Sequence, residues 1–69
     1  MQYTAERAPQ YLTTRQLAER LGIHPMSVNR FRMHGQGPVF IRVGTRSVRY
    51  SLAAVEAWEK AQTRTSTAV

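Results

Sequence analysis

The chain has no cysteine and no aspartate, and only one of its 69 residues, Lys60, is a lysine. Without cysteine there is no disulfide and no thiolate metal ligand, so side-chain packing alone must hold a small hydrophobic core. No run approaches the about 20 apolar residues of a membrane-spanning helix, and the first ten residues are largely polar. We therefore expect a cytoplasmic protein that is neither exported nor anchored in a membrane.

The residue types that carry catalysis are also sparse. Without aspartate the chain cannot form a Ser-His-Asp set, and it has neither paired carboxylates in a loop nor a glycine-rich phosphate loop. A chain of 69 residues leaves little room for a ligand pocket. His24 and His34 have no cysteine and no acid near them in the sequence, which argues against a metal site. We expect no enzyme, no cofactor and no metal.

Positive charge, in contrast, is abundant. Ten Lys plus Arg against four Glu give a net charge of +6, and nine of the ten cations are Arg. The planar guanidinium fork can donate two parallel hydrogen bonds to a phosphate or a base edge, which the ammonium group of Lys cannot do. Five arginines lie between Ile23 and Tyr50, a stretch without any acid: Arg30, Arg32, Arg42, Arg46 and Arg49. This bias predicts a polyanionic partner, with solubility as the alternative explanation.

Two short helices with a tight turn between them are predicted in the first half of the chain. Thr13 can cap a helix over residues 14–21, because Gln16 three residues later completes a capping box. Gly22 then allows the left-handed backbone that ends this helix. A second helix is predicted over residues 25–33, with a proline at its first position, where the missing amide costs nothing. Such a pair is typical of a helix-turn-helix.

Two β-rich runs follow, residues 39–43 and 47–50, with a three-residue connection between them. They predict a β-hairpin. Alternation along the two runs places four side chains toward the core, namely Ile41, Val43, Val48 and Tyr50. Arg42 and Arg49 then point the other way, and Arg46 lies at the tip of the hairpin.

A third helix is predicted to start behind Ser51, which can serve as its N-cap. Leu52, Val55 and Trp58 are spaced by three on one face, so we expect this face to be buried and Trp58 to be the largest core residue. The predicted fold class is therefore α+β, a winged helix-turn-helix with about three helices and a two-stranded β-hairpin wing.

The predicted domain takes up most of the chain. It covers residues 11–61 and is expected to bind DNA. Residues 1–10 contain few apolar side chains and are expected to form a flexible arm. Residues 62–69 are rich in Thr and Ser, show no periodicity and are expected to be a disordered tail.

The helix over residues 25–33 is the expected reader of DNA sequence, because a helix of this kind fits the major groove with its amino-terminal side chains at base edges. Asn29 matches adenine, Arg30 matches guanine, and Arg46 at the hairpin tip has the reach to enter a minor groove. His24 is expected to be a helix cap or a phosphate donor. The full set expected to contact DNA is Thr14, Arg15, His24, Pro25, Met26, Ser27, Asn29, Arg30, Met33, Arg42, Arg46 and Arg49.

Each of these residues also has a simpler interpretation. The polar side chains of the second helix would then form an ordinary solvated face, and Arg46 would be a solubilising loop residue. Met26 and Met33 can contact thymine methyl groups, but they are equally suited to filling gaps in a core or an interface.

A family resemblance covers about residues 11 to 60. It is carried by Leu12-Thr13, Leu17-Ala18, Leu21-Gly22-Ile23, Ser27-Val28, Arg30-Phe31, Gly35, Gly37-Pro38-Val39-Phe40-Ile41-Arg42-Val43-Gly44, Arg46, Val48-Arg49-Tyr50 and Val55-Glu56-Ala57-Trp58. This pattern resembles the small winged-helix excisionases, which are related to the DNA-binding domain of MerR-type regulators, and is most similar to members from actinobacterial phages.

The resemblance implies that residues 25–33 enter the major groove and that a wing over residues 42–49 reaches the adjacent minor groove. It also implies an excisionase that binds several sites in a phage attachment region, bends the DNA and directs an integrase toward excision without any catalysis of its own. The implied partners are attachment-site DNA, a phage integrase and further copies of the chain bound cooperatively to DNA, in the cytoplasm of a bacterial host. Two alternatives remain open, a small winged-helix transcriptional regulator that binds promoter DNA and a module whose basic face binds an acidic protein.

Overall fold

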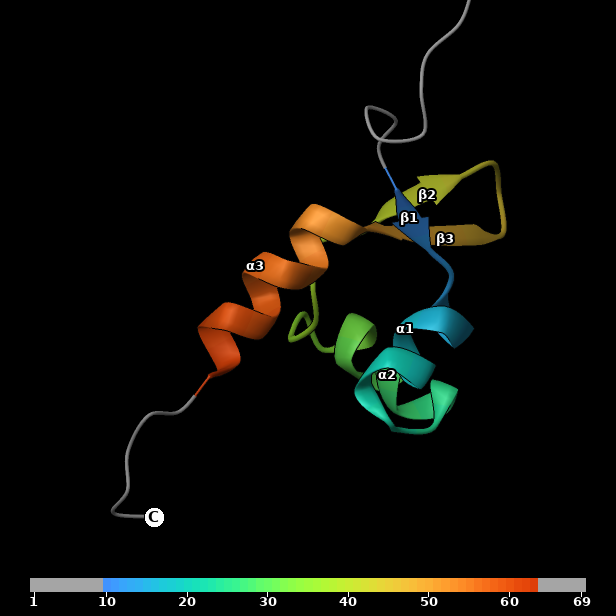
Figure 1. Ribbon diagram of the computed structural model, residues 1–69. Coiled ribbons are helices and arrows are strands. Elements are labelled where there is room, and N and C mark those ends of the chain that lie inside the picture. Colours follow the sequence, from blue (N-terminus) through green and yellow to red (C-terminus); the bar gives the residue numbers. More distant parts are fainter. Residues whose placement is uncertain (1–9, 64–69) are drawn as a thin grey trace, which may run out of the picture.

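The computed structural model of the chain describes residues 10–63 (Figure 1). Along the chain the elements are β1 (Tyr11–Leu12), α1 (Thr14–Leu21), α2 (Pro25–Met33), β2 (Ile41–Val43), β3 (Ser47–Ser51) and α3 (Leu52–Gln62). The predicted α+β winged helix-turn-helix is confirmed, with three helices and an antiparallel sheet. Most of the expected arm and tail, residues 1–9 and 64–69, lies outside the described residues.

The start of α1 is fixed by the predicted capping box. The Thr13 amide donates to Oε1 of Gln16 at 2.9 Å, and the Gln16 amide donates to Oγ1 of Thr13 at 3.0 Å. The helix ends at Gly22, whose φ of +70° is left-handed, and the next amide, that of Ile23, returns to the Ala18 carbonyl at 3.0 Å. This bond turns the chain sharply, so α2 begins only a few residues after α1 ends.

The second helix begins as predicted, with Pro25 at its first position. His24 caps it, because its Nδ1 accepts a hydrogen bond from the Met26 amide at 3.0 Å. The predicted cap role of His24 is confirmed.

The sheet has three strands in the order β1-β3-β2, one more than the predicted hairpin. In the added strand, Tyr11 pairs with Ser51 and Leu12 pairs with Tyr50. The Leu52 amide continues the pairing with a 2.8 Å bond to the Gln10 carbonyl. Two residues are too few to show an alternation of apolar and polar side chains, so no sequence pattern revealed β1.

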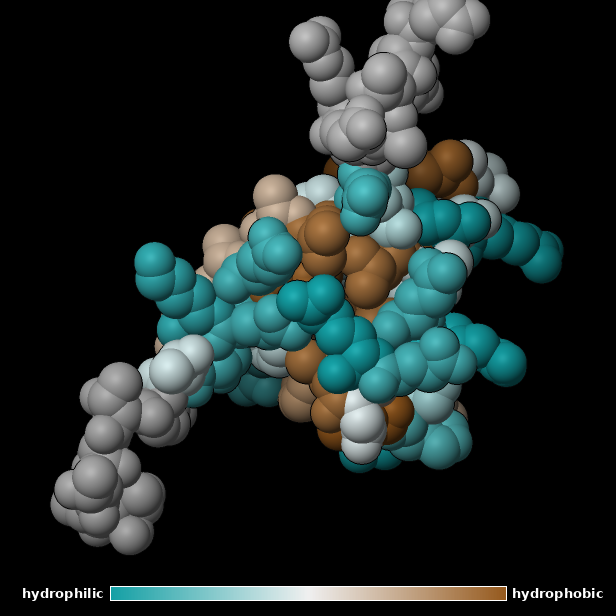
Figure 2. All heavy atoms as spheres, in the orientation of Figure 1, coloured by the Kyte–Doolittle hydropathy of each residue, from teal (hydrophilic) through white to brown (hydrophobic). Residues whose placement is uncertain are grey.

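The pairing of β2 with β3 corrects the predicted orientation of the wing, which comprises β2, β3 and residues 44–46 between them. Ile41 pairs with Arg49 and Val43 with Ser47, so these side chains share the outer face of the sheet. Ile41 is 46% exposed and Val43 is 50% exposed, and the prediction that they face the core is wrong. Figure 2 shows hydrophobic side chains at this outer edge of the molecule, where Figure 1 draws β2.

The same register places Arg42 opposite Val48, on the core side of the sheet. The prediction that Arg42 and Arg49 point the same way is therefore also wrong. Val48 and Tyr50 alone, of the four predicted inward residues, are buried.

The core lies between the sheet and the helices and contains Leu17, Ala18, Val28, Val48, Tyr50 and Val55. Tyr50 is its largest fully buried side chain, so the prediction that Trp58 would be the largest core residue is wrong. Trp58 is only partly buried: its ring lies 6.1 Å from that of Phe31, and its Nε1 donates to the Gln36 carbonyl at 2.8 Å. The reason is that α3 starts at the sheet and runs away from it (Figure 1), so only its first turns cover the core.

An ion pair connects α3 to α1. Nε of Arg20 donates to Glu59 at 2.7 Å, and a second nitrogen of the same guanidinium donates to the other carboxylate oxygen at 2.9 Å. These hydrogen bonds hold the pKa of Glu59 below its usual value and that of Arg20 above its own. The helix continues to Gln62, one residue beyond the predicted end of the domain, and carries Lys60 exposed in its last turn.

Candidate nucleic-acid interface

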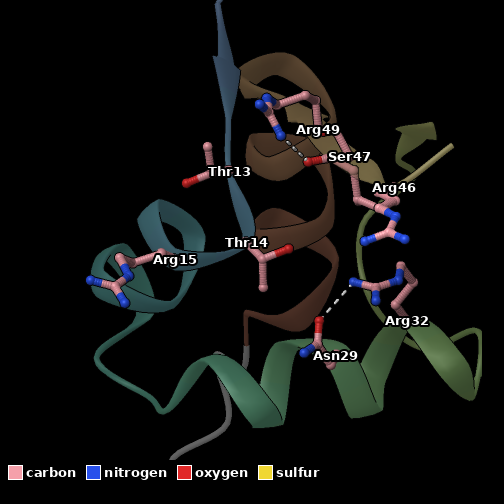
Figure 3. Close-up of a pocket in the computed structure, with 9 residues that line it drawn as sticks. Thr13, Thr14, Arg15, Asn29, Arg32, Arg46, Ser47 and Arg49 are labelled. Carbon is pink, nitrogen blue, oxygen red and sulfur yellow. Dashed lines mark hydrogen bonds between the residues drawn. The ribbon is translucent and has the colours of Figure 1, made fainter. Parts of the chain in front are cut away.

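The first turn of α1, the middle of α2 and the wing enclose an open hollow of about 370 Å³ (Figure 3). We call it the arginine hollow, and it is lined by Thr13, Thr14, Arg15, Asn29, Arg32, Arg46, Ser47, Val48 and Arg49. Four of these nine residues are arginines and none is acidic. Three different elements thus bring their polar side chains to one place.

The arrangement of charge in the arginine hollow favours an anion. Figure 3 shows Thr14, Asn29, Arg32 and Arg46 directed toward a common space, whereas Arg15 points away from it. Two guanidinium groups that share a space repel each other, and no carboxylate among the lining residues offsets that repulsion. A phosphate group between them would replace repulsion with charge-assisted hydrogen bonds.

Arg32 is the one arginine of the hollow that was not among the predicted DNA-contacting residues. Its side chain donates to Oδ1 of Asn29 at 2.9 Å and to the Tyr50 hydroxyl at 3.3 Å, and its guanidinium lies 5.8 Å from the centre of the Phe40 ring. The spacing of Asn29 and Arg32 by three residues on one helix was a usable signal, because residues so spaced are neighbours. The contacts with Tyr50 and Phe40 depend on the tertiary fold and left no pattern in the sequence.

The structure gathers five of the predicted DNA-contacting residues at the arginine hollow, namely Thr14, Arg15, Asn29, Arg46 and Arg49. Arg49 is half-buried and also donates to the Val48 carbonyl at 2.9 Å. That bond fixes one of its nitrogens on the wing and leaves the rest of the fork for other partners.

The other predicted residues lie outside the arginine hollow. Met26 is 58% exposed and Met33 is 78% exposed, and together with Arg30 they form the outer face of α2. His24 and Pro25 line a second open hollow beside α1. Ser27 is half-buried near the start of α2, and Arg42 is exposed on β2. Contact of all these residues with DNA stays a prediction.

Within residues 10–63, no three His, Asp or Glu side chains come together in a way that could hold a metal ion. No helix in that part of the chain has both the length and the apolar character needed to cross a bilayer.

A helix-turn-helix joined to a basic wing defines a winged helix-turn-helix DNA-binding domain. Comparison with models of protein families gives a match over residues 11–63 to the family described as Helix-turn-helix domain, and the chain belongs to this family. Searches of curated proteins and of solved structures give no match. The family and the geometry together make the chain a sequence-specific DNA-binding protein.

Proposed function

We propose that the chain is an excisionase, an architectural protein that binds phage attachment-site DNA in several copies, bends it and directs an integrase toward excision. The observation that carries this proposal is the convergence of α2 and the wing on one arginine hollow. A helix in the major groove and a wing in the neighbouring minor groove would place their positive charges along the same side of the duplex.

Bending follows from that placement. Cations on one side of a duplex neutralise the phosphates there, while the phosphates on the far side continue to repel one another. The duplex then curves toward the protein, at a cost that depends on how flexible the base steps are. The sequence resemblance to excisionases and the gathering of arginines from α2 and the wing at one hollow support the same role.

Cooperative binding follows from size. A single small module covers roughly 600–1,000 Å² of protein surface on DNA, which is at the low end for high specificity. Several copies on neighbouring sites would supply the rest, and head-to-tail contacts between them would build an open array rather than a closed two-fold dimer. The free protein is expected to be monomeric.

Footprinting on attachment-site DNA with and without the cognate integrase tests the proposal. We expect protection of several adjacent sites, a rise in excisive recombination when the protein is added, and anomalous mobility of circularly permuted fragments. Protection of one promoter site, with unchanged recombination and mobility independent of site position, would instead identify a transcriptional regulator.

A further inference from the structure

We propose that Arg32 determines the base preference of α2 by fixing the orientation of the Asn29 side-chain amide. Arg32 is here a positioning residue, which acts on DNA sequence through Asn29. The proposal rests on the sequence-specific DNA binding of the chain and does not depend on its role in excision.

The amide of Asn29 needs such a partner to have one defined orientation. Its oxygen and its NH₂ group are similar in size, so a half-turn of the amide changes the hydrogen bonds that it offers but hardly its shape. The guanidinium group of Arg32 contains only hydrogen-bond donors, so the oxygen of the Asn29 amide must face it. The 2.9 Å contact between them shows this orientation. In Figure 3 the nitrogen of Asn29 is turned away from Arg32.

Arg32 can impose this orientation because the core holds it in place. The Tyr50 hydroxyl accepts from the same terminal nitrogen of Arg32, at 3.3 Å, that donates to Asn29. Tyr50 is only 1% exposed, and the Phe40 ring lies beneath the guanidinium at 5.8 Å. A chain of contacts therefore runs from the buried face of β3 through Arg32 to Asn29 on α2.

A fixed amide can tell base pairs apart in a way that a rotating one cannot. With its oxygen on Arg32, Asn29 presents its NH₂ donors, which match an acceptor such as a purine N7 or thymine O4 in the major groove. An amide free to flip would also accept from the amino group of cytosine, so the loss of Arg32 should weaken discrimination more than affinity.

The test compares Arg32→Met with Arg46→Met. Both variants remove one guanidinium from the arginine hollow, but only Arg32 bonds to Asn29, since Arg46 belongs to the wing. The probe is a pool of DNA duplexes with a randomised central stretch, from which the bound fraction is sequenced. We expect both variants to bind random DNA more weakly, and only Arg32→Met to lose preference at one base position, by on the order of tenfold.

Two further variants separate positioning from stability. In an Asn29→Ala background, Arg32→Met should change the base preference no further, because there is no amide left to orient. Arg32→Lys keeps the charge but not the planar guanidinium that lies over the Phe40 ring, so it should keep most affinity and lose the same preference. Thermal unfolding of each variant identifies the folded ones, and Arg32→Lys decides the question where Arg32→Met does not fold.

The proposal is overturned if Arg32→Met or the folded Arg32→Lys retains the wild-type preference, or if Arg46→Met loses preference at the same position. It is also overturned if the loss is equally large without Asn29. A wild-type protein that enriches no sequence from the pool would refute sequence-specific binding itself, which is a distinguishable result.

Discussion

Tyr50 belongs to both the hydrophobic core and the edge of the arginine hollow. Its ring is buried and lies 6.1 Å from the Phe40 ring, whereas its hydroxyl accepts from Arg32 at the edge of the arginine hollow. A tyrosine suits this place because it combines a large apolar body with a polar end that needs a partner when buried. The stability of the core and the geometry of the interface therefore depend on one side chain.

Substitutions at Tyr50 should separate these two contributions. Tyr50→Phe keeps the ring and removes one long hydrogen bond, so we expect a loss of about 1 kcal/mol in the free energy of unfolding. Tyr50→Ala removes the largest buried side chain and should cost about 3 to 5 kcal/mol. Trp58→Ala, at a partly buried site, should cost less than Tyr50→Ala. Urea unfolding measures all three, and a Trp58→Ala variant less stable than Tyr50→Ala would contradict the described core.

Gly22 offers a second prediction at the scale of a single residue. Its φ is +70°, and a Cβ added there would meet no atom within 4 Å, so only backbone strain opposes a side chain. Gly22→Ala should therefore reduce the free energy of unfolding by about 1–2 kcal/mol. Gly22→Asn should cost less, because asparagine tolerates the left-handed region better. Equal stability of Gly22→Ala and wild type in urea unfolding would refute the left-handed turn.

Local chemistry explains which residues the sequence predicted well. The Thr13 cap, Pro25 at the start of α2 and the His24 cap involve neighbours within three positions, so the sequence itself contains both partners. The bond from Arg32 to Tyr50 spans 18 residues and exists only once the wing has folded back on α2. Patterns in the sequence therefore indicated a basic surface. They did not indicate which of its arginines is held in place by hydrogen bonds to other side chains.

The wing shows at the scale of an element how loop length decides orientation. With three residues between paired Val43 and Ser47, every residue of β2 faces a residue of β3 whose number has the same parity. The predicted inward set combined odd positions in β2 with even positions in β3, which a three-residue connection does not allow. The alternation of hydrophobic residues within each strand was visible in the sequence. The length of the connection between the strands decided which residues of β2 face the core.

The ion pair between α1 and α3 makes the stability of this contact depend on pH. Because the folded-state pKa of Glu59 is lowered by hydrogen bonds from Arg20, the pair stabilises the fold above the ordinary carboxyl pKa. That contribution is lost as the pH falls through the lowered value. We expect Glu59→Gln to be less stable than wild type near neutral pH, with a difference that disappears in acid. Thermal unfolding across this range measures the difference, and one that grows in acid would contradict the pairing.

At the scale of the whole molecule, the positive charge is concentrated in the part of the sequence that forms α2 and the wing. The arginines of α2 and the wing occupy residues 23–50, which contain no acid, whereas the described glutamates lie on α1 and α3. This uneven distribution of charge orients the protein toward DNA by electrostatic attraction before any specific contact forms.

Binding should consequently depend steeply on salt. Roughly five phosphate contacts would give a log-log slope of affinity against salt near −4 to −5. Arg46→Met should reduce the magnitude of that slope by about 1 and weaken all sequences alike. Fluorescence anisotropy over a salt series gives the slopes, and an affinity that hardly changes with salt would refute a phosphate-contacting surface.

Lys60, exposed in the last turn of α3, is the one lysine of the chain, and the arginine hollow contains none. The one lysine side chain and the arginine hollow are therefore separate in this molecule. A dye coupled to Lys60 and the amino terminus would leave every cation of the hollow unmodified, whereas an arginine-directed reagent such as phenylglyoxal would attack the hollow itself. Lysine acetylation, which weakens many protein–DNA contacts by removing charge, likewise has no target among those cations.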